Sequence, residues 1–250
     1  MEEINRKWKA IWEKREPDSS SITDLNDAKN VFMELKRLDG FDVVNGGLSY
    51  DALMEQYEET KKNLFVNEDS FYKDKSIFEV GCGSGANLYL FEQDNYKVGG
   101  VDYSEKLIET AVKVLKSDDV KCLEAKDISI VPEYDVTLSN SVFSYFPGYE
   151  YAKQVLELMY AKTRYAIGLI DIHDIERKDD FIDYRKREVE DYEERYKDLP
   201  KLFYERQFFE KFANEHDMDI VFMDSKVKGY WNNEYIFNCY LYKRVKNQNI

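Results

Sequence analysis

Apolar and polar positions follow two periods along the chain, in which short apolar runs are followed by stretches of helical spacing. From residue 76 onward the runs are short enough for buried strands, and the stretches between them repeat apolar residues every three or four positions. Strands are predicted at 76–80, 96–101, 120–124, 134–138, 165–171, 219–227 and 235–243. Helices are predicted at 85–93, 104–116, 149–162 and 205–215. This alternation predicts an α/β fold, a doubly wound parallel sheet covered by helices on both faces.

The last two apolar runs are separated by a turn at 229–233 and not by a helix. Because this connection is too short for a helical crossover, strands 219–227 and 235–243 are predicted to run antiparallel to each other.

The first 70 residues show helical spacing only, and we predict that they form a helical cap before a domain at 71–246. Amphipathic helices are predicted at 1–16, at 24–38 and from Tyr50 to Leu64. Ser21-x-x-Asp24 could start the second helix as a capping box. These helices either roof a ligand site, with Tyr50 and Tyr57 facing the substrate, or pack along an edge of the sheet.

Residues 174–204 carry many charges of both signs with aromatic residues spaced between them. This pattern is typical of a solvated amphipathic helix. It predicts either a helical lid inserted in the domain or simply an exposed face.

Three alternate glycines follow the first strand of the sheet. Gly81, Gly83 and Gly85 lead from the apolar run 76–80 into the next helix. Glycine is needed where the backbone takes a positive φ or where a ligand leaves no room for a Cβ. The helix behind such a turn presents unpaired N–H groups, and this edge of an open sheet is where nucleotides bind. Asp102 closes the second strand 21 positions after Gly81, a spacing that suits a carboxylate binding ribose hydroxyls.

The glycines alone leave more than one function open. Gly81-x-Gly83-x-x-Ala86 also fits the loose dinucleotide fingerprint, which indicates an NAD-dependent oxidoreductase. No convincing Tyr-x-x-x-Lys pair accompanies it. A third possibility is a non-catalytic cofactor-binding module whose cap and lid recruit a partner protein.

Composition narrows the range of partners. The 250 residues carry a formal net charge of −14, which argues against binding to nucleic-acid phosphates. The chain has no apolar leader and no run near the roughly 20 apolar residues of a membrane helix, so we predict a cytoplasmic protein that does not bind membranes. Three cysteines form neither an even set nor a metal-ligand cluster, and no metal site is predicted.

With these elements placed, residues 76–245 resemble the class I S-adenosylmethionine-dependent methyltransferases. The features that match are Glu79-x-Gly81-x-Gly83-x-Gly85, Asp102 after the second strand, Asp127 after the third, and the closing antiparallel pair. The carboxylate of Glu79 and the close spacing of the third glycine separate this pattern from the NAD fingerprint. The resemblance implies a Rossmann-like, seven-stranded sheet with an antiparallel last strand.

The resemblance also implies roles for single residues toward S-adenosylmethionine and its product S-adenosylhomocysteine. The glycines let the backbone pass beneath the cofactor, while Glu79 orients the loop and the amino-acid end. Asp102 and Tyr103 meet the ribose and adenine, and Asp127 and the backbone of Ile128 meet the amino edge of adenine. Asn140 and Ser141 line the methionine end. Their surroundings, Ser139-Asn140-Ser141-Val142-Phe143, depart from the Asn/Asp-Pro-Pro-Tyr type of amino-group nucleic-acid methylases, which favours a small acceptor.

Methyl transfer to oxygen benefits from a base. His173 is the candidate, because it follows the fifth strand and titrates near neutrality, with Asp171 or Asp174 as its partner. Further substrate-side candidates are aromatic or polar residues near the same edge: Tyr145, Tyr204, Tyr230, Trp231 and Asn232. The predicted acceptor is a hydroxyl or amine of a small polar metabolite or sugar-like molecule. The sequence makes no prediction of the oligomeric state.

Overall fold

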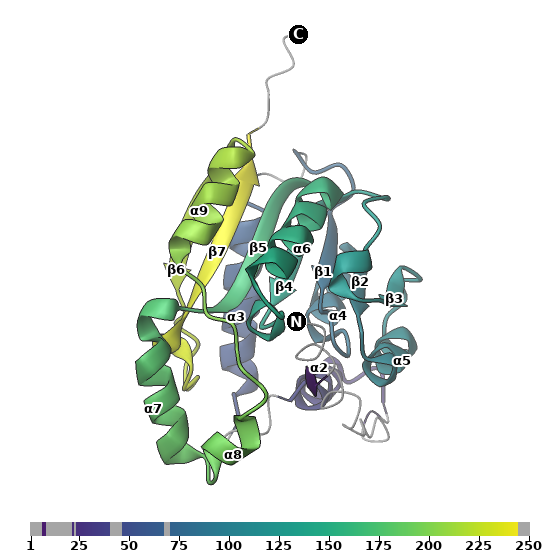
Figure 1. Cartoon of the computed structure of the whole chain (residues 1–250). Coiled ribbons are helices and arrows are strands. Elements are labelled where there is room, and N and C mark those ends of the chain that lie inside the picture. The colour runs from purple at the N-terminus through teal and green to yellow at the C-terminus, as the bar shows by residue number, and fades with distance from the viewer. Residues whose placement is uncertain (1–6, 9–21, 23, 41–46, 68–70, 245–250) are drawn as a thin grey trace.

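The computed structural model describes residues 7–8, 22, 24–40, 47–67 and 71–244 (Figure 1). Within them lies one seven-stranded sheet of order β3-β2-β1-β4-β5-β7-β6. Its strands are β1 (Ser76–Val80), β2 (Lys97–Asp102), β3 (Val120–Cys122), β4 (Tyr134–Asn140), β5 (Thr163–His173), β6 (Met218–Asp224) and β7 (Ile236–Lys243). Strand β7 runs antiparallel to both β5 and β6, and the remaining pairs are parallel. The predicted Rossmann-like sheet with its antiparallel last strand is confirmed.

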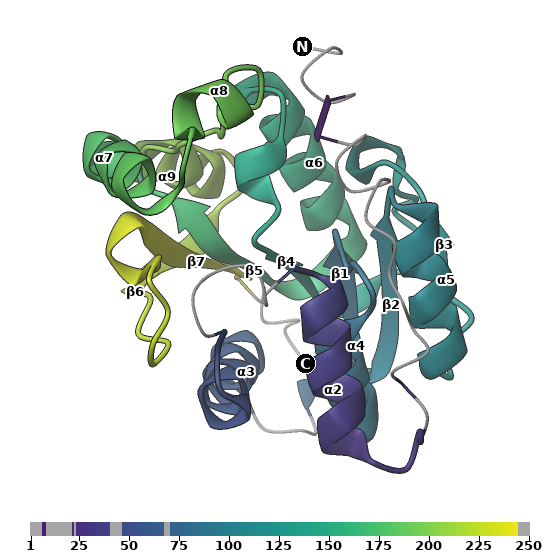
Figure 2. The same cartoon turned by 90° about the horizontal axis from the view of Figure 1, so that it is seen from below.

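Helices cover both faces of the sheet, as Figure 2 shows from below. Their bounds are α2 (Ala28–Leu38), α3 (Tyr50–Leu64), α4 (Ala86–Gln93), α5 (Glu105–Val114), α6 (Tyr149–Lys162), α7 (Lys178–Glu188), α8 (Tyr192–Tyr196) and α9 (Arg206–Glu215). Helices α2 to α5 share one buried apolar cluster with Ile77 and Val136 of the sheet. Helices α6 and α9 share a second cluster with Ile167 and Leu169. Because residues of a strand point to alternate faces, these two clusters are the cores on the two sides of the sheet.

The helices α2 and α3 are part of the first of these cores. Helix α3 packs on β5, where a Cβ added at Gly168 would lie 2.9 Å from Leu64 Cδ2. Helix α2 lies against α4, as Figure 2 shows. These two helices therefore act mainly as an extra layer on the sheet. The helix predicted at 1–16 lies outside the described residues except for 7 and 8, and the boundary predicted near residue 70 stays a prediction.

Helix α2 begins later than its spacing predicts. Its N-cap is Asp27, whose carboxylate accepts the N–H of Asn30 at 3.0 Å. The Asp24 carboxylate instead accepts the N–H of Asn26 at 2.8 Å in a preceding turn. The prediction of a start at Asp24 is wrong, because Asp24 bonds to its own turn and does not cap the helix.

Two strands reach farther than predicted, and both extensions matter for the site. Strand β4 continues to Asn140, and β5 runs from Thr163 to His173. The end of β5 pairs with β7, where Ile172 and His173 face Phe237 and Ile236. The register shifts between Leu169 and Ile172, a bulge that redirects the strand beside the cavity described below.

The charged segment 174–204 contains two α-helices, α7 and α8, which lie below the lower end of the sheet in Figure 1. Phe181 of α7 packs with Phe203 and Tyr235 in a small buried cluster of their own. This cluster attaches the segment to the turn between the last two strands.

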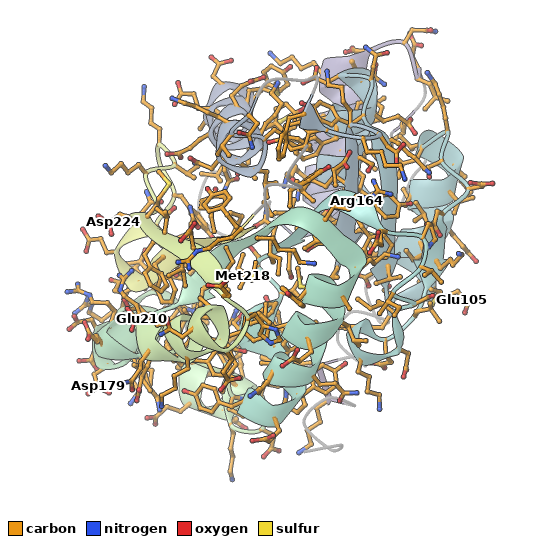
Figure 3. The ribbon with its side chains drawn as sticks, turned by 90° about the horizontal axis from the view of Figure 1, so that it is seen from above. Glu105, Arg164, Asp179, Glu210, Met218 and Asp224 are labelled. Atoms are coloured by element: carbon orange, nitrogen blue, oxygen red, sulfur yellow. The ribbon has the colours of Figure 1, made fainter. Side chains whose placement is uncertain are left out.

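An ion-pair network lies at the edge of the sheet where β4 and β5 begin. Arg164, labelled in Figure 3, donates from Nη1 to Asp74 Oδ2 at 2.8 Å and to Asp135 Oδ1 at 3.0 Å. The fully buried Asp135 also accepts the N–H of Ser76 at 3.0 Å. The start of β1 is thereby tied to β4 and β5.

Candidate active site

A cavity of about 520 Å³ lies at the carboxyl ends of the parallel strands. Its described lining includes the ends of β1 (Glu79, Gly81), β2 (Asp102, Tyr103), β4 (Asn140, Ser141) and β5 (Asp171, His173). Helices α2, α7 and α8 contribute further side chains. The volume and position are those of a small-molecule site in an open α/β sheet.

The predicted glycine turn forms the floor at one end of this cavity. Gly81, Gly83 and Gly85 have φ values of 76°, 54° and 87°, which other residues rarely adopt. A Cβ at Gly83 would meet the Asp39 carboxylate, and a Cβ at Gly81 would meet Val142. Gly85 lies outside the described lining, and a Cβ there would lie 3.0 Å from Leu115 Cδ1. The third glycine therefore serves the contact between α4 and the end of α5.

Asp102 holds the glycine turn in place. Its Oδ2 accepts the N–H of Gly83 at 3.0 Å, and its Oδ1 accepts the N–H of Ser104 at 2.8 Å. Burial raises the pKa of this carboxyl, while the backbone N–H bonds from Ser104 and Gly83 act against that rise. The carboxylate lines the cavity from the position predicted for a ribose ligand.

Glu79 is buried beneath the turn. Its Oε1 accepts from Asn87 Nδ2 at 2.6 Å, whereas its Oε2 has no hydrogen-bond partner among the described residues. Burial raises the pKa of Glu79 to about 8. A buried carboxyl with an unused oxygen in a cavity wall is suited to a ligand with N–H or ammonium donors.

Helix α2 adds two charged residues that sequence reasoning missed. The buried Lys36 donates from Nζ to Asn87 Oδ1 at 3.0 Å, and burial lowers its pKa. Asp39 Oδ1 accepts the N–H of Ser84 at 2.7 Å, and burial raises its pKa to about 6. A signal was present, because Lys36 stands four residues after Phe32 on the apolar face of the helix.

The predicted adenine contacts, Asp127 and the backbone of Ile128, lie outside the described lining of the cavity. Asp127 is exposed and Ile128 is buried in the second core. Strand β3 ends at Cys122, and a short 3-10 helix at Ala125–Asp127 follows. This turn brings Leu123, Glu124 and Ala125 to the cavity, beside Tyr103.

Asp171 is the centre of a hydrogen-bond cluster where β4 and β5 end. Its Oδ2 accepts from Ser141 Oγ and from the Tyr230 hydroxyl, each at 2.6 Å, and its Oδ1 accepts from Asn232 Nδ2 at 3.0 Å. Asp171 and Ser141 have φ values of 61° and 59°. Strained, non-glycine backbone of this kind is characteristic of functional sites.

His173 lines the cavity, but its surroundings differ from the prediction. It lies between the rings of Phe181 and Phe203, with centroid distances of 4.8 and 5.2 Å. Burial and the charges of Lys201 and Arg185 lower its pKa well below the usual value. The expectation that it titrates near neutrality is therefore wrong, because burial disfavours the imidazolium.

Neither predicted carboxylate partner contacts His173. Asp171 bonds to the three groups named above, and Asp174 pairs with Arg206 at 3.2 Å. His173 Nε2 instead faces Asn232 Nδ2 at 3.4 Å, while Nδ1 has no partner among the described residues. Since Asn232 Nδ2 is a donor, we assign the Nδ1–H tautomer to this histidine from the network.

Four of the predicted substrate-side residues line the cavity: Tyr145, Tyr230, Trp231 and Asn232. The other three lie outside the described lining. Tyr50 packs on Phe32, the Tyr57 hydroxyl donates to Asp94 at 2.7 Å, and the Tyr204 hydroxyl donates to the Phe143 carbonyl at 2.9 Å. The segment 174–204 supplies Phe181, Tyr184, Arg185, Arg195, Tyr196, Leu199 and Lys201 to the lining.

Comparison with known families agrees with this geometry. Residues 78–164, from β1 to the start of β5, match a family model described as a methyltransferase domain. The chain contains a class I methyltransferase domain. This domain is of the S-adenosylmethionine-dependent type, and the predicted family, enzyme class and cofactor are confirmed at this level.

Two curated relatives match parts of the methyltransferase chain. A malonyl-[acyl-carrier protein] O-methyltransferase of Priestia megaterium is 29% identical over 108 residues, 41% of this chain and 39% of the relative. A nonribosomal peptide synthetase of Metarhizium robertsii is 25% identical over 164 residues, 56% of this chain and 2% of the relative. The chain thus spans well under half the length of either.

Solved methyltransferase structures share the fold of this chain beyond residues 78–164. Magnesium protoporphyrin IX methyltransferase from Synechocystis, solved with S-adenosylmethionine, aligns with a TM-score of 0.56 at 14% identity, over 87% of this chain and 98% of that one. The plantazolicin methyltransferase, solved with S-adenosylhomocysteine and a triazolic desmethylPZN analogue, aligns with a TM-score of 0.59 at 18% identity, over 97% of this chain and 96% of that one. Among the residues that the structure describes, no helix is long and apolar enough to cross a membrane.

Proposed function

We propose that this protein transfers the methyl group of S-adenosylmethionine to a hydroxyl or amine of a small polar or sugar-like acceptor, releasing S-adenosylhomocysteine. One observation carries the proposal. A single cavity joins the glycine turn with Asp102 to the Asp171 cluster and to the aromatic side chains of the segment 174–204. A cofactor and an acceptor can therefore lie end to end in one enclosed space.

The residues at the glycine end fit the cofactor. The unused Oε2 of Glu79 suits the amino group of its methionine part, and Asp102 suits the ribose hydroxyls. Tyr103 lies beside the adenine position. When bound, the cofactor supplies an electrophilic sulfonium methyl, so the protein has mainly to align the acceptor and exclude water.

The Asp171 cluster is placed to orient the acceptor and to take its proton. Asp171 Oδ2 accepts hydrogen bonds from the hydroxyl groups of Ser141 and Tyr230, and a hydroxyl group of the methyl acceptor could replace either of these donors. We assign the role of proton acceptor to Asp171 rather than to His173. The neutral His173, with its hydrogen on Nδ1, serves as a hydrogen-bond donor.

A turnover assay tests the proposal. The purified chain is incubated with S-adenosylmethionine and a panel of small alcohols, phenols, sugars and amines, and S-adenosylhomocysteine formation is followed. Product that depends on one acceptor class supports the proposal. Binding of S-adenosylhomocysteine without turnover on any acceptor would favour the non-catalytic module, and saturable binding of NADH would favour the oxidoreductase. We also propose a cytoplasmic location for this activity.

A further inference from the structure

The charges that line the cavity change sign from one end to the other. Around the glycine turn the lining carries four carboxylates, Asp39, Glu79, Asp102 and Glu124, and a single cation, Lys36, which is bonded to Asn87. At the end formed by the segment 174–204, every charged lining side chain in the described structure is basic. These are Arg185 of α7, Arg195 of α8, and Lys201. In a chain with a net charge of −14, a basic patch inside a cavity runs against the overall composition.

The three basic side chains lack carboxylate partners. Within the described residues, no carboxylate oxygen of an Asp or Glu lies within 4.0 Å of a side-chain nitrogen of these three residues. Neighbouring cations of the same segment are paired, since Lys186 lies 2.7 Å from Glu193 and Arg177 lies 3.3 Å from Asp180. The three cations that face the cavity are thus without a carboxylate among the described residues, whereas these two neighbours outside the lining are neutralised by one.

Aromatic rings hold two of these cations in place. Arg185 Cζ lies 5.3 Å from the ring centroid of Trp231, and its Nη2 donates to the Tyr196 hydroxyl at 3.2 Å. Lys201 Nζ lies 4.1 Å from the ring centroid of Tyr145. Cation–π contacts position a cation without neutralising it, so both side chains keep their charge for a ligand.

A flat apolar wall stands beside these charges. Tyr184 and Trp231 both line the cavity, and their rings are stacked 5.3 Å apart with an angle of 8° between their planes. The positive charges of Lys201 and Arg185 also lower the pKa of His173, which lines the cavity where its two ends meet. A methyl acceptor lying here meets cations and ring faces.

We propose that the methyl acceptor carries an anionic group, a carboxylate or a phosphate, next to a planar apolar body. Arg185 and Lys201 bind the anionic group, Arg195 adds to the positive field, and Tyr184 and Trp231 pack on the planar part. Arg185 suits either anion because its guanidinium donates in a bidentate manner. This inference rests on the proposed function, since it describes the acceptor of the same site.

Calorimetry with matched probes tests the inference. The complex with S-adenosylhomocysteine is titrated with para-hydroxybenzoate, with its neutral isostere para-hydroxybenzamide, and with para-hydroxyphenyl phosphate. We expect an anion to bind about tenfold more tightly than the amide, as one charge-assisted pair allows. A tighter carboxylate or a tighter phosphate distinguishes the two sources of the charge.

Variants connect the preference to the named residues. Arg185→Gln and Lys201→Gln should each remove most of the preference, whereas Arg185→Lys, which retains the charge, should keep part of it. Lys186→Gln is the matched control, because Lys186 lies on the same helix but pairs with Glu193 outside the described lining. Thermal melting and S-adenosylhomocysteine affinity should be the same in all four variants.

Equal affinity for anion and amide would overturn the inference, as would the absence of saturable anion binding in the millimolar range. A preference that survives in both Gln variants would overturn it as well. In each of these cases S-adenosylhomocysteine still binds and the proposed function stands. If S-adenosylhomocysteine does not bind, the proposed function itself fails.

Discussion

The hydroxyl of Tyr230 donates to Asp171 Oδ2 across 2.6 Å, although the two residues are 59 positions apart in the sequence. The fold brings them together by pairing β5 with β7 and turning the chain just before β7. Asp171 thereby gains donors from two segments, while its carboxylate faces the cavity.

The first prediction concerns this pair. Asp171→Asn removes the proposed proton acceptor and should lower kcat for a hydroxyl acceptor by about 10²- to 10⁴-fold, the usual range for general-base catalysis. Tyr230→Phe should lower it less, by about tenfold, because the carboxylate remains. Steady-state kinetics of S-adenosylhomocysteine formation measure both effects. Tyr57→Phe is the matched control, since its hydroxyl bonds to Asp94 away from the cavity, and an equal loss there would contradict the assignment.

The second prediction follows from Glu79. Burial raises its pKa from 4.5 to about 8, so the folded state holds a proton that the unfolded state releases. This group therefore stabilises the fold fully below about pH 4.5, and its contribution is lost as the pH rises through about 8. Glu79→Gln should be more stable than the natural protein at about pH 9, by a few kcal/mol, and close to it at about pH 5.

Urea unfolding at the two pH values measures this difference. Asp39, whose pKa is raised to about 6, adds a dependence of the same sign and is present in both proteins, so the difference between them reports mainly on Glu79. The exposed Glu55→Gln serves as control and should follow the natural protein. A Glu79→Gln protein with an unchanged pH dependence would show that Glu79 is ionised in the folded state.

The sequence predicts the part of the site that comes from strand ends. Glu79, Gly81, Gly83 and Asp102 line the cavity because parallel strands place their carboxyl ends at one edge, which periodicity alone can locate. Asn140 and Ser141 follow from the same rule.

The remaining parts of the site depend on packing that the sequence does not show. Lys36 and Asp39 reach the glycine turn only because α2 lies against α4. Glu124 and Ala125 line the cavity while Asp127 and Ile128 do not, because a 3-10 helix follows the short β3, and periodicity cannot resolve such a local turn.

The third prediction separates stability from function. Asp135 is fully buried and accepts bonds from Ser76, Asp74 and Arg164 at the edge of the sheet away from the cavity. Asp135→Ala should lower the free energy of unfolding by about 3–5 kcal/mol, because it removes the buried carboxylate partner of Arg164 and leaves the N–H of Ser76 without its acceptor. Urea unfolding gives the value.

Asp219→Ala is the control for this loss. Its ion pair with Arg244, at 2.9 Å, is exposed and should contribute no more than about 1 kcal/mol. At a temperature where the Asp135→Ala protein remains folded, the affinity of this variant for S-adenosylhomocysteine should equal that of the natural protein. A tenfold weaker affinity in the folded variant would mean that the two edges of the sheet are coupled.

The central claim is that the cavity above the glycine turn binds the methyl donor through Asp102. Calorimetry of S-adenosylhomocysteine binding to the natural protein, Asp102→Asn and Asp127→Asn tests it most directly. We predict one site per chain, an affinity at least about tenfold weaker in Asp102→Asn, and no change in Asp127→Asn, whose side chain is exposed outside the described lining. Absence of binding to the natural protein, or equal affinities for all three proteins, would contradict the account.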